Sequence, residues 1–238
     1  MSKVTEHFFD DRNEMFSALT KACAEKLTQA VATQGKASFM VSGGSTPKPL
    51  YQNLAEQALP WGDIQVALVD ERWVPPTSPS SNQAFCENSL LQNNAQAATF
   101  IPMKTEHDSA KEGLSTTIDA YSQLAAPFDI TVLGMGGDGH TASIFPNCEG
   151  IEQALDANSP QKLSAIMAHK SEVTGDNLER ITLSLSGILD SKFLVLLITG
   201  DSKREVYQQA LAASDPRLTP ISAVLQQTDV PVHVYWAP

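Results

Sequence analysis

Short apolar runs separated by polar, glycine-containing turns are the main pattern of this chain. Runs of four to six residues that are apolar and rich in Val, Ile and Leu are typical of strands buried on both faces of a sheet. On this pattern the sequence predicts strands over Val4–Phe9, Ser38–Val41, Ile64–Val69, Ile130–Leu133, Leu163–Ala168, Arg180–Leu185, Phe193–Thr199 and Val230–Tyr235.

Helical patterns lie between these runs. Asp10 or Asp11 is expected to cap a helix that runs to about Gln34, and Gly35 to end it. Further helices are expected after a Ser45 or Thr46 cap, over about Asn82–Leu91, over Ser109–Ala126, after the glycine turn at 134–139, from an Asp201 cap to about Ala213, and as a short turn over Pro220–Leu225. The segment between the strands at 163–168 and 180–185 is polar and is expected to be a loop.

The alternation of strands and helices predicts an α/β fold with a mainly parallel sheet and helices on both faces. The one Pro/Ser-rich stretch, residues 75–81, is too short to act as a linker between domains. We therefore expect residues 1–238 to form a single domain.

Four turns with polar or charged residues each follow a predicted strand: residues 43–46, 70–72, 134–140 and 200–203. The carboxyl ends of parallel strands meet at one edge of an open sheet, where ligands bind. A shared site is therefore expected, although each turn alone is a weak indication.

The first turn, Gly43, Gly44, Ser45 and Thr46, presents backbone N–H groups and two hydroxyls at a helix start. That combination favours a phosphate group. An ordinary capped turn is the alternative, and the spacing of a P-loop is absent.

The second turn places Asp70 and Arg72 where a strand ends. A carboxylate there can orient a group or take a proton, and a guanidinium can stabilise developing negative charge. A solvated strand end with a surface ion pair is an equally good interpretation of this motif alone.

The third turn formally matches the dinucleotide pattern G-x-G-x-x-G over residues 134–139. Its mid-chain position counts against a dinucleotide site, and so does a histidine directly after the last glycine. The expected ribose-binding acid should end a second strand about 20 residues on, whereas Asp156 lies in a polar, helix-like stretch.

His140 is the imidazole that we expect to carry chemistry, because glycines, an acid and hydroxyl residues surround it in this turn. An ordinary histidine pKa of about 6.5 suits a base that later acts as an acid. No G-x-S-x-G nucleophile elbow is present, so a serine triad is not indicated. The other histidines are interpreted as structural: His7, His107, His169 and His233.

Two cations complete the candidate set. Arg180 begins a strand, and Lys203 lies in the first turn of a helix, where a positive charge opposes the helix dipole unless it meets an anion. A phosphate partner would compensate for that penalty; a solvated lysine is the alternative.

The net charge of −11 argues against nucleic acid or an anionic membrane as a partner. The three cysteines are widely spaced and form no CxxC or Cys/His cluster, so neither a disulfide framework nor a zinc site is indicated. No signal-peptide core or run of about 20 apolar residues appears. A cytoplasmic location is expected.

Together these motifs resemble the 6-phosphogluconolactonase family, within the glucosamine-6-phosphate isomerase/deaminase superfamily. The resemblance rests on SGGSTP, DERWVP followed by Ser81-Asn82, LGMGGDGHTASIFP, RITLS, TGDSK and PISAVL, in that order over nearly the whole chain. It implies a modified Rossmann-like fold without metal or cofactor. It also implies hydrolysis of 6-phospho-D-glucono-1,5-lactone in the oxidative pentose phosphate pathway.

The resemblance makes His140 the expected base and assigns the phosphate to residues 43–46 and Lys203. Arg72 would stabilise the oxyanion, Asp70 or Asp138 would orient His140 or the water, and Arg180 would assist with the phosphate. Further substrate-binding positions are expected at Asn82, Gly136 and Gly139.

Two alternatives stay open: an amino-sugar-phosphate isomerase or deaminase, and a non-catalytic sugar-phosphate sensor. In each case the expected partner is a small sugar phosphate, and the expected state is a monomer or weak homo-oligomer.

Overall fold

Seven parallel strands form the central sheet of the computed structural model, which describes residues 3–238. Across the sheet the order is β1 (Val4–Phe8), β10 (Val232–Ala237), β9 (Leu194–Thr199), β6 (Ile130–Leu133), β2 (Ala37–Val41), β3 (Ile64–Leu68) and β5 (Thr99–Ile101). The predicted parallel sheet is confirmed, with β5 as a strand that the sequence pattern missed. Strands β2 and β6 are buried at every residue, as their continuous apolar runs indicated.

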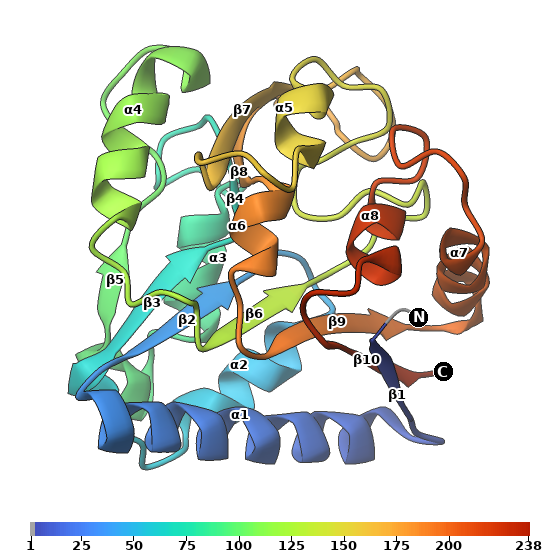
Figure 1. Ribbon diagram of the computed structural model, residues 1–238. Helices are drawn as coiled ribbons and strands as arrows, with labels where there is room; N and C mark the ends of the chain where they lie inside the picture. The colour runs from blue at the N-terminus through green and yellow to red at the C-terminus, as the bar shows by residue number, and fades with distance from the viewer. Residues whose placement is uncertain (1–2) are drawn as a thin grey trace.

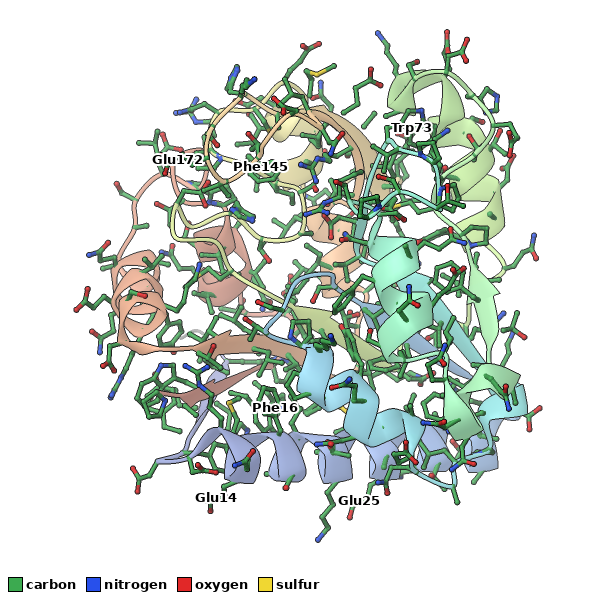
Figure 2. The ribbon with its side chains drawn as sticks, turned by 180° about the vertical axis from the view of Figure 1, so that it is seen from behind. Glu14, Phe16, Glu25, Trp73, Phe145 and Glu172 are labelled. Atoms are coloured by element: carbon green, nitrogen blue, oxygen red, sulfur yellow. The ribbon has the colours of Figure 1, made fainter. Side chains whose placement is uncertain are left out.

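Helices cover both faces of this sheet, as predicted (Figure 1). Their bounds are α1 (Arg12–Gln34), α2 (Lys48–Ala55), α3 (Asn82–Ser89), α4 (Ala110–Tyr121), α5 (Ile151–Leu155), α6 (Leu185–Leu189), α7 (Asp201–Leu211) and α8 (Ile221–Gln226), with 3-10 turns η1 (Trp61–Asp63) and η2 (Asn93–Ala97). Helix α1 runs along one face, where Phe16 points toward the sheet and Glu14 and Glu25 point away (Figure 2). Helices α6 and α8 pack against each other on the opposite side (Figure 1).

A second, three-stranded antiparallel sheet joins β4 (Asp70–Arg72), β8 (Glu179–Leu183) and β7 (Leu163–Met167). Residues 70–72 were expected to be a turn but form its edge strand, in which Arg72 lies opposite Arg180. The small sheet therefore carries residues from two distant parts of the chain to the carboxyl edge of the large sheet.

The predicted helix ends are partly confirmed. Asp11 caps α1 through its carboxylate, and Gly35 ends it in the left-handed conformation (φ 80°). Neither Ser45 nor Thr46 caps α2, because Pro47 takes that position with helical dihedrals. Asp201 is the first residue of α7, and Gly200 precedes it as the cap.

The helix expected directly after the glycine turn is wrong. Residues 134–150 form a series of turns, and the next helix is α5. Left-handed φ values at Gly139, Ala142, Asn147 and Gly150 interrupt any helical run. His140 therefore lies in an irregular loop, and its backbone carbonyl accepts a hydrogen bond from the Gly136 N–H of the same loop.

Within residues 3–238, no helix combines the length and the apolar character needed to cross a bilayer. All three cysteines are buried as free thiols. Burial raises the pKa of Cys23 to about 12, so this thiol stays protonated and inert.

Candidate active site

A cleft of about 410 Å³ lies where the predicted turns come together. Strands β2, β3, β6 and β9 are parallel neighbours in the sheet, so the segments that follow them emerge at one edge. Of the predicted site residues, the cleft is lined by Gly43, Gly44, Ser45, Thr46, Asp70, Arg72, Asn82, Gly136, His140 and Lys203. Asp138, Gly139 and Arg180 lie outside its lining.

His140 and Asp138 form a hydrogen-bonded pair within the glycine turn. The Nδ1 atom of His140 lies 2.6 Å from Oδ1 of Asp138, and the His140 backbone N–H donates to the same oxygen at 3.1 Å. Because a carboxylate only accepts, this bond places the imidazole proton on Nδ1 and leaves Nε2 as the basic nitrogen. Nε2 makes no hydrogen bond to any residue in the range 3–238.

The ionised form of Asp138 is favoured. Burial raises the pKa of Asp138, but the hydrogen bond and positive charge of His140 oppose that effect and leave the pKa below its ordinary value. Of the two acids that could orient His140, the structure places Asp138 in contact with it.

Glycine is required at two positions of this turn. A Cβ atom on Gly136 would lie 2.0 Å from His140 Nδ1 and 2.4 Å from Asp138 Oδ1, so the backbone abuts the pair. Gly139 has φ +79°, and its carbonyl accepts a hydrogen bond from the Ile221 N–H at 2.9 Å. These residues therefore shape the loop around His140.

Asp70 is held by other partners. Ser143 donates to its Oδ2 at 2.6 Å, and the Asn82 amide donates to its backbone oxygen at 2.8 Å. Gly43 leaves the room that Asn82 needs, since a Cβ there would lie 2.0 Å from the Asn82 Oδ1. Asp70 is thus a fixed carboxylate in the cleft lining, hydrogen-bonded to the central loop through Ser143 and to the start of α3 through Asn82.

Glu71 has a structural position that the sequence did not reveal. It is 1% exposed and accepts hydrogen bonds from Ser81 Oγ and from the backbone N–H groups of Asn82 and Gln83 at the start of α3. Burial raises the pKa of Glu71, and these hydrogen bonds only partly counter it. The sequence around these two acids does not show that Asp70 lines the cleft while Glu71 is buried, because that difference comes from how α3 packs on β4.

The cations at the cleft have different surroundings. Arg72 donates from Nη1 to the Ser80 carbonyl at 2.5 Å, and its buried Nε has no partner within residues 3–238. Lys203 donates to the Met135 carbonyl at 2.9 Å. Burial lowers the pKa of Lys203, and the charge of Asp138 partly opposes this shift. The hydroxyls of Ser45 and Thr46 make no hydrogen bond to the described part of the chain, so they are free for a ligand.

Arg180 is 3% exposed and is not among the residues that line the cleft. Its Nη2 donates to the Thr174 carbonyl at 3.1 Å, and its guanidinium lies over the ring of Phe145 at 5.6 Å. Its predicted contact with a phosphate therefore stays a prediction that this placement does not favour. Within residues 3–238, no group of three His, Cys, Asp or Glu side chains has the arrangement of a metal site.

Comparison with known proteins defines the family. A family model described as glucosamine-6-phosphate isomerases/6-phosphogluconolactonase matches residues 10–236. The chain belongs to this family. The match includes every residue that lines the cleft and every candidate site residue.

Individual members of the family match almost end to end. A 6-phosphogluconolactonase of Rhizobium meliloti is 38% identical over 232 residues, which cover 98% of each chain. The crystal structure of a 6-phosphogluconolactonase from Shewanella baltica has a TM-score of 0.92 at 38% identity and covers 99% of this chain and 98% of its own. A monomeric glucosamine-6-phosphate deaminase, at 20% identity and a TM-score of 0.73, shares the fold.

Proposed function

We propose that this protein hydrolyses 6-phospho-D-glucono-1,5-lactone to 6-phosphogluconate, a step of the oxidative pentose phosphate pathway. The observation that carries the proposal is the placement of His140, oriented by Asp138, in the same cleft wall as Ser45, Thr46 and Lys203. A base and a phosphate-binding turn then face one small substrate. The relatives named 6-phosphogluconolactonase support the same activity.

The proton chemistry follows from the His140–Asp138 pair. Nε2 of His140 takes a proton from water as the water oxygen bonds to the lactone carbonyl carbon. The tetrahedral intermediate collapses, the bond from that carbon to the ring oxygen breaks, and the imidazolium returns its proton to the ring oxygen. Asp138 stabilises the imidazolium through Nδ1 and fixes the tautomer.

Arg72 is proposed to stabilise the oxyanion. It is the arginine that lines the cleft, and a guanidinium there can donate to developing negative charge. Asp70, locked by Ser143 and Asn82, is proposed to hold a substrate hydroxyl or the attacking water rather than His140.

The 6-phosphate is proposed to bind between the first turn and the start of α7. Ser45 and Thr46 offer free hydroxyls, and Lys203 offers a cation at a helix N-terminus where an anion is favoured. Binding of the phosphate would hold the lactone carbonyl carbon near His140, so that the water and the carbon react in a fixed geometry.

A second candidate is the isomerase or deaminase reaction on an amino-sugar phosphate, because the family description includes that activity. It would use the same phosphate-binding turn but a different proton-transfer chemistry at the sugar. Release of ammonia from glucosamine 6-phosphate distinguishes it from the lactonase.

We further propose that residues 1–238 act as one 6-phosphogluconolactonase-like domain, in the cytoplasm, as a monomer or weak homo-oligomer. The single domain rests on the absence of a linker signal in the sequence.

The test is lactone hydrolysis by the purified, EDTA-treated protein, with the lactone generated in place and spontaneous hydrolysis subtracted. Acceleration that survives EDTA supports the proposal. Ammonia release from glucosamine 6-phosphate without lactone hydrolysis would favour the deaminase. Binding of 6-phosphogluconate with neither activity would identify a sensor.

A further inference from the structure

The orientation of the His140 ring is not fixed by hydrogen bonding alone. Its one side-chain hydrogen bond goes to Asp138, which is only two residues away in the same loop and whose side chain is 32% exposed. The second side-chain torsion of histidine has a broad energy well, so one bond at Nδ1 leaves the ring plane free to swing. A base that attacks through Nε2 needs that plane to be held.

Phe145 supplies a surface against which the imidazole rests. The two ring centroids are 4.5 Å apart with a 40° tilt, and Phe145 is buried. The Gly136 backbone abuts the Nδ1–Cε1 side of the same imidazole. Figure 2 shows Phe145 among the loops that lie beyond the strands of the large sheet.

Phe145 is in turn held by Arg180. The guanidinium lies over the phenyl ring at 5.6 Å from the centroid, a distance at which the ring quadrupole attracts a cation. Burial lowers the pKa of Arg180 to about 10, so the side chain remains charged near neutral pH. Arg180 is fixed by strand β8 and by its hydrogen bond to the Thr174 carbonyl.

We propose that Phe145 is a positioning residue for the lactonase reaction: it holds the His140 ring in line with the cleft, and Arg180 holds Phe145. This inference rests on the proposed function. It gives Arg180 a part in catalysis that requires no contact with substrate. Arg180 is fixed on strand β8, and through Phe145 it limits the movement of the His140 imidazole, which lies in an irregular loop.

The test compares Phe145→Leu with a matched control, Phe128→Leu. Phe128 is buried, and the Lys162 ammonium lies 5.5 Å from its ring centroid. It precedes β6 and so lies toward the opposite end of that strand from the cleft. The control therefore loses an aromatic ring and a cation contact of the same kind. Phe145→Met provides a second truncation if the leucine variant does not fold, and Phe145→Tyr keeps the aromatic face.

Steady-state lactone hydrolysis is measured for each variant after the wild-type activity has been established. Phe145→Leu and Phe145→Met are expected to lower kcat by about 10- to 100-fold, the cost of a misplaced catalytic group. The KM is expected to change by about twofold or less, because the phosphate contacts are untouched. Phe145→Tyr is expected to recover most of kcat, and Phe128→Leu to keep it within about twofold of wild type.

A folded Phe145→Leu or Phe145→Met variant with wild-type kcat would overturn the inference. So would a rise in KM with unchanged kcat, a tyrosine variant no more active than the leucine variant, or an equal loss of kcat in Phe128→Leu. Absence of lactonase activity in the wild-type protein would instead refute the proposed function, so the two failures are distinguishable.

Discussion

Replacing Gly136 with alanine is a sharp perturbation of the His140–Asp138 pair. The added methyl carbon would lie 2.0 Å from His140 Nδ1 and 2.4 Å from Asp138 Oδ1, well inside van der Waals contact. Gly136 does not have a left-handed φ, so alanine meets no backbone strain there. The substitution therefore acts by displacing the two side chains.

The size of the effect follows from the bond that would be broken. A hydrogen bond to a charged group contributes about 1.5–3 kcal/mol, and each 1.36 kcal/mol of transition-state stabilisation is about tenfold in rate. If the 2.6 Å Nδ1–Oδ1 bond is lost, kcat should fall by about 10- to 150-fold. The KM should change less, because the turn proposed to bind the phosphate is not disturbed.

Gly137→Ala is the matched control for this measurement. It lies next to Gly136 in the same turn, but a Cβ there would meet nothing nearer than the Lys203 Nζ at 4.0 Å. Its kcat is expected to stay within about threefold of wild type. A folded Gly136→Ala protein with the kcat of Gly137→Ala would show that the close pairing of His140 and Asp138 does not matter for turnover.

Three further outcomes are expected. Lys203→Ala should raise KM by about tenfold and weaken discrimination against unphosphorylated gluconolactone; unchanged discrimination would remove Lys203 from the phosphate site. Because burial lowers the pKa of Lys203, its ammonium group loses its proton below the ordinary lysine pKa as the pH is raised. The wild-type KM should therefore begin to rise below that pH, since the neutral amine binds the phosphate less well. The lowered pKa of Asp138, where the His140 contact outweighs burial, means that the unfolded state binds more protons. The stability from Asp138 is therefore present above its unfolded pKa and is lost as pH falls through its folded pKa. The free energy of unfolding, measured in urea, should fall less between about pH 7 and pH 3 for Asp138→Asn than for wild type. An equal fall in the two proteins would contradict this.

The parts of the fold that could be predicted are those that depend on the local pattern of apolar and polar residues. The apolar runs of β2, β6 and β9 identify buried parallel strands, and parallel strands bring their following turns to one edge. The grouping of Ser45, Thr46, His140 and Lys203 in one cleft follows from that geometry.

The parts that could not be predicted depend on contacts between distant segments. Residues 70–72 form a strand because β8 pairs with them across more than a hundred residues of chain. The predicted helix after His140 fails because left-handed residues that are not glycine, Ala142 and Asn147, carry no simple sequence signal. The same holds for the contact of Arg180 with Phe145, which depends on how β8 packs beside the central loop.

Turnover of His140→Asn beside the wild-type protein, on lactone generated in place, tests the central claim most directly. Asparagine cannot relay a proton at neutral pH, so kcat should fall by about 10²- to 10⁴-fold while 6-phosphogluconate binding persists. An unchanged kcat would contradict the assignment of His140 as the base.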